Sequence, residues 1–110
     1  MKITLDMVKK MVPDAKAMTA AKGVAAPKCW AKLGEDAKGL WGVCKGSSTY
    51  EVFVDTDNNC YCTCPSRKRP CKHALGLLLL AAGGHEIPKA AAPPGHIEAA
   101  QEARYDQIWE

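Results

Sequence analysis

The first 23 residues carry hydrophobic side chains at helical spacing, at Leu5, Met7, Val8, Met11 and Val12. Thr4 is a suitable N-cap for this run, and Pro13 interrupts it. Asp14 can cap a second short helix over residues 15–22, with Gly23 as its stop. The pattern therefore predicts an N-terminal helical segment, formed either by one kinked helix or by two.

The middle of the chain changes to short runs of β-branched and apolar residues separated by turns. Residues 40–44 are apolar, and residues 49–55 are β-branched and aromatic with partial alternation. Residues 45–48 and 56–59 have turn composition, rich in Gly, Ser, Asn and Asp. Residues 60–64 alternate again and can return as a strand. This region predicts two or three antiparallel strands.

A strongly hydrophobic helix is predicted over residues 71–82. Pro70 suits the start of a helix, and Gly83 and Gly84 can end it. Its apolar residues cover most of the circumference: Leu75, Leu77, Leu78, Leu79 and Leu80. A helix that is apolar all round is either part of the core or covered by a partner, and the core is the commoner case.

Three other segments show little periodicity. Residues 24–39 contain several Gly and Pro residues, and we expect a loop there, anchored by Trp30 and Leu33. Residues 84–95 combine prolines with alanines, which is typical of a linker. Residues 96–109 have the length of a last short helix. The linker and the short helix together predict a flexible C-terminal arm.

Composition indicates one small domain with a thin core. The chain has 110 residues, of which 47% are hydrophobic but only 6% aromatic. A domain of this kind often needs a metal or disulfides for stability, and six cysteines offer either. No secretory signal or bilayer-length apolar run is present, so we expect a cytoplasmic protein. Clustered cysteines in a reducing compartment are more often metal ligands than disulfides.

The net charge of +3 is concentrated in one loop. Four cations lie within six residues without an acid between them: Arg67, Lys68, Arg69 and Lys72. Over the rest of the chain, acidic and basic residues nearly balance. The total charge is too small to indicate nucleic-acid binding by itself, so the placement of these cations matters more.

A metal-ligand pattern immediately surrounds this loop. Its spacing is C-x-C-x6-C-x-H, formed by Cys62, Cys64, Cys71 and His73. Three thiolates and one imidazole are a ligand set for a closed tetrahedral zinc site. Residues two apart on a strand point to the same face, and the N-terminus of the following helix favours negatively charged thiolates. The pattern predicts one structural zinc ion.

Other candidate ligands are weaker. Cys60 would share a strand face with Cys62, so a Cys60/Cys62 pair is the main rival to Cys62/Cys64. We interpret Cys29 and Cys44 as small core residues. The histidines outside the motif, His85 and His96, lie in or beside the linker and are expected to be solvated.

The segment resembles the SWIM-type zinc finger, whose signature is C-x-C, a variable loop and C-x-H. The resemblance is carried by W-G-V-C-K-G-S at residues 41–47 and by C-P-S-R-K-R-P-C-K-H-A-L-G-L-L-L at residues 64–79. It covers about residues 27–82, and departs at Arg69, where an aromatic is expected, and at the extra Cys60. The resemblance implies a zinc-binding ββα element that contacts DNA or proteins. Small bacterial proteins of this type are often associated with MoxR-type ring ATPases and von Willebrand A-domain proteins.

These observations predict a small α+β fold. A zinc-stapled β-hairpin or three-stranded antiparallel sheet and the hydrophobic helix form its centre, with N-terminal helices on one side. The expected segments are 1–26 for the helical region, 27–83 for the zinc finger domain, and 84–110 for the linker and short C-terminal helix.

The expected function is binding without catalysis. Four protein ligands leave no open position on the zinc, and no nucleophile–base pair or phosphate-binding glycine loop stands elsewhere. The four cations of the basic loop indicate nucleic acid, although cations can also stabilise zinc-bound thiolates. The alternative is a protein-interaction adaptor that uses the Leu-rich helix and the C-terminal arm. Neither a membrane nor a small-molecule substrate is expected.

Overall fold

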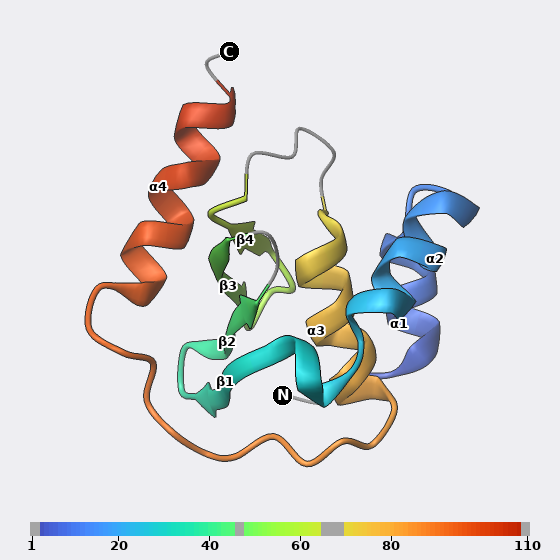
Figure 1. The fold of residues 1–110 in the computed structure, drawn as a ribbon, viewed down its shortest axis with the longest axis horizontal. Coiled ribbons are helices and arrows are strands. Elements are labelled where there is room, and N and C mark those ends of the chain that lie inside the picture. Colours follow the sequence, from blue (N-terminus) through green and yellow to red (C-terminus); the bar gives the residue numbers. More distant parts are fainter. Residues whose placement is uncertain (1–2, 46–47, 65–69, 109–110) are drawn as a thin grey trace.

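A four-stranded antiparallel sheet in the order β1-β2-β3-β4 forms the centre of the fold (Figure 1). The computed structural model describes residues 3–45, 48–64 and 70–108, the last six as backbone. The strands are β1 (Trp30–Asp36), β2 (Gly39–Lys45), β3 (Thr49–Asp55) and β4 (Cys60–Cys62). The helices are α1 (Leu5–Met11), α2 (Ala15–Val24), α3 (Lys72–Ala82) and α4 (His96–Ile108), with a 3-10 turn η1 (Pro27–Cys29). The predicted small α+β class is confirmed.

Strand β1 lies where a loop was expected, so the sheet has four strands rather than two or three. Gly34, which suggested a loop, and Gly42 in the neighbouring strand β2 both lie against indole rings. A Cβ on Gly34 would lie 2.3 Å from the Trp41 ring, and one on Gly42 would lie 2.7 Å from the Trp30 ring. Glycine is therefore required there by close packing rather than by a turn.

The inner face of the sheet is covered by α3, and α1 and α2 pack against the other side of α3 (Figure 1). The Leu-rich helix is thus core, as its hydrophobic pattern indicated. Its buried residues include Leu75, Leu77, Leu78 and Leu80. Within the described residues, no helix is long and apolar enough to span a bilayer.

The N-terminal segment forms two helices. Thr4 caps α1 by accepting a hydrogen bond from the Met7 N–H, and Asp14 caps α2 by accepting one from the Ala17 N–H. Helix α2 continues through Gly23, which was expected to end it. The close approach of α2 to α3 occurs at Gly76, where a Cβ would lie 3.0 Å from the Val24 side chain.

The outer face of the sheet is covered by the C-terminal arm, which runs around the end of the sheet and places α4 against β3 and β4 (Figure 1). Trp41 and Phe53 on this face form a small buried cluster with Ile97 and Ala100 of α4. The prediction of an arm that trails away from the domain is therefore corrected. The helix expected over residues 96–109 is present as α4.

Hydrogen bonds to β1 and β2 hold the segment before α4. The Glu35 N–H donates to the Pro88 carbonyl at 2.9 Å, and the Ala90 N–H donates to the Glu35 carbonyl at 3.0 Å. The Trp41 indole N–H donates to the Ala90 carbonyl at 2.8 Å, and the Ala92 N–H donates to the Asp36 carboxylate at 3.1 Å. This segment extends the edge of the sheet beyond β1.

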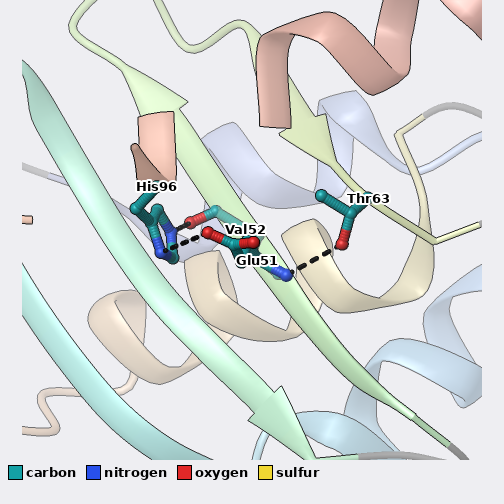
Figure 2. A network of polar contacts seen from close by, with 4 residues as sticks. All are labelled: Glu51, Val52, Thr63 and His96. Atoms are coloured by element: carbon teal, nitrogen blue, oxygen red, sulfur yellow. Dashed lines mark hydrogen bonds and ion pairs between the residues drawn. The ribbon is translucent and has the colours of Figure 1, made fainter. Parts of the chain in front are cut away.

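His96 anchors the start of α4 on β3 (Figure 2). Its side chain is only 1% exposed, so the expectation of a solvated residue is wrong. One ring nitrogen, Nε2, lies 2.8 Å from the Val52 carbonyl oxygen, and Nδ1 lies 3.5 Å from the Glu51 carboxylate. The ring also makes an edge contact with Trp41. His85, in contrast, is exposed as expected.

Candidate metal centre

Four buried side chains converge at one end of the inner face, where β4 and α3 meet. They are the four residues of the sequence pattern: Cys62, Cys64, Cys71 and His73. Their candidate ligand atoms all lie within 4.8 Å of one another. Tetrahedral zinc with bonds of about 2.0–2.3 Å places its ligand atoms about 3.5–3.8 Å apart. The donor set and its spacing therefore fit one zinc ion.

The strand side of the centre is held by a short extension of sheet pairing. Strand β4 ends at Cys62, although a regular strand was expected to continue to Cys64. The Thr63 N–H donates to the Glu51 carbonyl at 3.1 Å, and the Thr63 hydroxyl accepts from the Glu51 N–H at 3.0 Å (Figure 2). This exchange keeps the chain beside β3 for one more residue. The Cys64 N–H then points at the Cys62 sulfur, 3.5 Å away.

The helix side of the centre is the start of α3. Cys71 is the N-cap, its carbonyl accepting from the Leu75 N–H, and His73 is the second residue of the helix. The His73 Nδ1 atom lies 3.7 Å from the Cys62 sulfur and 4.0 Å from the Cys71 sulfur. Nδ1 is therefore the ring nitrogen that can act as a ligand.

Tyr50 covers the imidazole of His73. Their ring centroids are 4.8 Å apart and the planes are inclined by 34°. The sequence interpretation did not include Tyr50 in the site. The sequence contains an indication of its position, because Tyr50, Val52 and Val54 alternate along one strand and therefore share a face.

Contacts within the cluster favour the protonated forms of Cys62 and His73. Hydrogen bonds with Cys64 and Cys71, together with burial, raise the pKa of the Cys62 thiol well above its usual range. Burial lowers the pKa of His73, but the neighbouring thiols raise it by more, to about 9. Metal ligation requires thiolates and a neutral imidazole, so loading the site would release these protons.

The remaining cysteines lie outside the cluster. Cys60 is half-buried, and its sulfur lies 3.7 Å from the Asn58 carbonyl oxygen, on the side of the β3–β4 turn. The geometry therefore favours Cys62 and Cys64 over a Cys60/Cys62 pair. Cys44 is buried in the core as expected, and burial raises the pKa of its thiol to about 11. Cys29 is half-buried and packs against the same core.

Of the four predicted nucleic-acid-binding residues, the structure describes only Lys72. Arg67, Lys68 and Arg69 lie outside the described residues. Lys72 is the first residue of α3 and is exposed, directly before His73.

Comparison with known families identifies this region. Residues 50–82 match the SWIM zinc finger family, and the match spans β3, β4 and α3 with all four clustered residues. No curated protein and no solved structure matches the chain. Over residues 50–82 the resemblance seen in the sequence is confirmed, and this segment is a SWIM zinc finger, a zinc-binding module for one ion.

Proposed function

We propose that Cys62, Cys64, Cys71 and His73 hold one structural zinc, and that the surface beside this zinc binds nucleic acid. Four protein ligands complete a tetrahedral coordination shell, so no position remains for a reactive water or substrate. The role of the metal is to join β4 to α3. The strand and helix joined by the zinc then position the neighbouring surface for binding, and the module catalyses no reaction.

The division of charge between the two ends of the sheet carries this proposal. Lys72, the residue before His73, begins α3, and Lys45 ends β2 at the same end of the sheet; both are exposed. At the opposite end, four carboxylates lie in or beside the β1–β2 and β3–β4 turns and outnumber the two lysines there, Lys38 and Lys89: Glu35, Asp36, Asp55 and Asp57. The zinc end of the sheet is therefore the end suited to phosphate groups.

The sequence adds three cations between two of the clustered cysteines. Arg67, Lys68 and Arg69 belong to the segment that joins Cys64 to Cys71, and both of these cysteines lie in the cluster. Zinc with three thiolates and a neutral imidazole has a net charge of −1, which one nearby cation can balance. Four cations exceed this requirement, and the excess supports contact with a polyanion.

The test is fluorescence anisotropy of zinc-loaded protein with labelled single- and double-stranded DNA and RNA across a salt series. A contact with four phosphates predicts a slope of log K against log salt of about −3.6 on a duplex and about −2.8 on a single strand. The variant Arg67→Glu/Lys68→Glu/Arg69→Glu should lose binding. A control with the same change in charge, Lys9→Glu/Lys10→Glu/Lys16→Glu on α1 and α2, should retain most of it.

No binding at low salt, from protein shown to hold its zinc, would contradict the proposal. The cations of the basic loop would then act only to balance the negative charge of the zinc centre. The adaptor alternative has less structural support, because α3 is buried and Leu5 is the only exposed large hydrophobic residue among those described.

A further inference from the structure

We propose that the Thr63 hydroxyl sets the geometry of the metal centre, which makes Thr63 a positioning residue for zinc although it supplies no ligand. The inference rests on the zinc site of the proposed function and is independent of nucleic-acid binding. It follows from the register between β3 and β4, from the hydrogen bonds between Thr63 and Glu51, and from the short distances within the cluster.

Thr63 stands opposite Glu51 in the register of the β3–β4 pair. Val52 pairs with Cys62, so the next position along brings Glu51 opposite Thr63. Two residues at a hydrogen-bonded position of a regular antiparallel ladder exchange both of their N–H···O=C bonds. The Thr63 N–H does donate to the Glu51 carbonyl at 3.1 Å, but the Glu51 N–H donates to the Thr63 hydroxyl at 3.0 Å (Figure 2). The side-chain oxygen therefore takes the place of the main-chain carbonyl.

This replacement releases the Thr63 carbonyl from the ladder, so the following peptide can turn out of the strand. Strand β4 ends at Cys62, and the Cys64 N–H points back at the Cys62 sulfur, 3.5 Å away. Parallel side chains two residues apart on a regular strand are about 6.6–6.8 Å apart. The candidate ligand atoms of the cluster, in contrast, all lie within 4.8 Å of one another. The turn at Thr63 therefore brings the two cysteines close enough to share one ion.

A side chain without a hydroxyl cannot preserve both the turn and the hydrogen bond. If the turn persists, the N–H of the half-buried Glu51 loses its acceptor, which costs free energy. If the main-chain carbonyl of residue 63 returns to accept this bond, the strand continues and Cys64 moves away from the ion. Serine retains the acceptor, whereas valine has nearly the shape of threonine without it. These two substitutions therefore separate the role of the hydroxyl from that of side-chain volume.

The test measures the zinc affinity of the full chain by competition with a chromophoric chelator. Thr63→Val should weaken zinc binding about 10- to 100-fold, the usual effect of removing a group that orients metal ligands. Thr63→Ser should stay close to the unaltered protein. The matched control is Thr49→Val, because Thr49 is an exposed threonine of β3 whose side chain forms no hydrogen bond among the described residues.

A second measurement separates positioning from general stability. Co²⁺ can take the place of zinc in a tetrahedral thiolate site, and its charge-transfer absorption increases with the number of bound thiolates. At saturating cobalt, Thr63→Val should lose the contribution of one thiolate, whereas Thr63→Ser and Thr49→Val should keep the full spectrum. A variant that is only less stable would also keep the full spectrum once it is saturated.

Unchanged zinc affinity of Thr63→Val, or weaker affinity with the full cobalt spectrum, overturns the inference and leaves the zinc site standing. If Thr63→Val takes up no cobalt, Thr63→Ser decides: normal affinity supports the inference, and a loss equal to that of Thr63→Val overturns it. Failure of the unaltered protein to bind zinc overturns the metal site and the inference together.

Discussion

The two faces of the sheet are covered in different ways. On the inner face, α3 packs aliphatic side chains such as Leu75 and Leu78 against Val52 and Val54 of β3, and the metal centre closes one end. On the outer face, a small cluster built on Trp41 and Phe53 is supplemented by hydrogen bonds from the C-terminal arm.

The two faces differ in the kind and the energy of their interactions. A buried leucine contributes about 1.5–3 kcal/mol, whereas a single hydrogen bond contributes about 1 kcal/mol net. The outer contacts join residues far apart in sequence, as between Asp36 and Ala92 or between Val52 and His96. We therefore expect the inner face to determine global stability and the outer face to behave as a local unit that can open by itself.

The largest expected effect is loss of zinc from the inner face. Structural zinc contributes about 10–16 kcal/mol in small domains, which matches or exceeds the total stability of most domains. Cys64→Ser should abolish stoichiometric zinc and the cooperative thermal transition, measured by metal analysis and circular dichroism. Cys60→Ser is the matched control and should retain both. A cooperative transition in chelator-treated protein would contradict this expectation.

A second substitution tests helix packing on the inner side. Gly76→Val would place a side chain against Val24 and the Ala21 carbonyl, both already close to the position of a Cβ. Overpacking of this kind costs about 1–3 kcal/mol in the free energy of unfolding. Gly23→Ala on α2 meets open space and should stabilise by about 0.5–1 kcal/mol. Urea denaturation measures both changes, and equal stability of the two variants would show that α2 adjusts freely.

On the outer face, His96→Ala should lower the free energy of unfolding by about 1–3 kcal/mol. The substitution removes the partner of the Val52 carbonyl and the contact with Trp41. Hydrogen exchange should rise at Ala90 and Ala92 while zinc stays bound. His85→Ala changes an exposed histidine and should have an effect below about 0.5 kcal/mol. Zinc loss in His96→Ala would show that the two faces are coupled.

The smallest effect is expected from Asp36→Ala. This carboxylate accepts hydrogen bonds from the Ala92 and Lys38 N–H groups. Their loss should lower the free energy of local opening of the arm by about 1 kcal/mol. Proteolysis of the arm should increase, while the melting temperature of the whole domain changes little. Glu86→Ala, an exposed carboxylate on the same arm, is the control. Unchanged proteolysis would show that the Trp41 indole and His96 hold the arm without Asp36.

The sequence was informative where a local rule applied. The caps Thr4 and Asp14, the run of leucines in α3 and the spacing of Cys62 to His73 each depend on residues close together in the chain. Strand β1 was missed because Gly34 was interpreted as a loop residue. Its missing side chain in fact leaves room for the Trp41 ring. A glycine required by a distant side chain has no local signature.

The sequence by itself determined the inner face: a metal-ligand set, a helix too apolar to be exposed, and the strand pattern that accompanies it. Tertiary structure decided how the outer face is covered and that His96 is buried there. The physical reason is the range of the interactions. Helix caps, strand alternation and ligand spacing act over a few residues, whereas the contacts of the arm form only after the sheet has brought distant segments together.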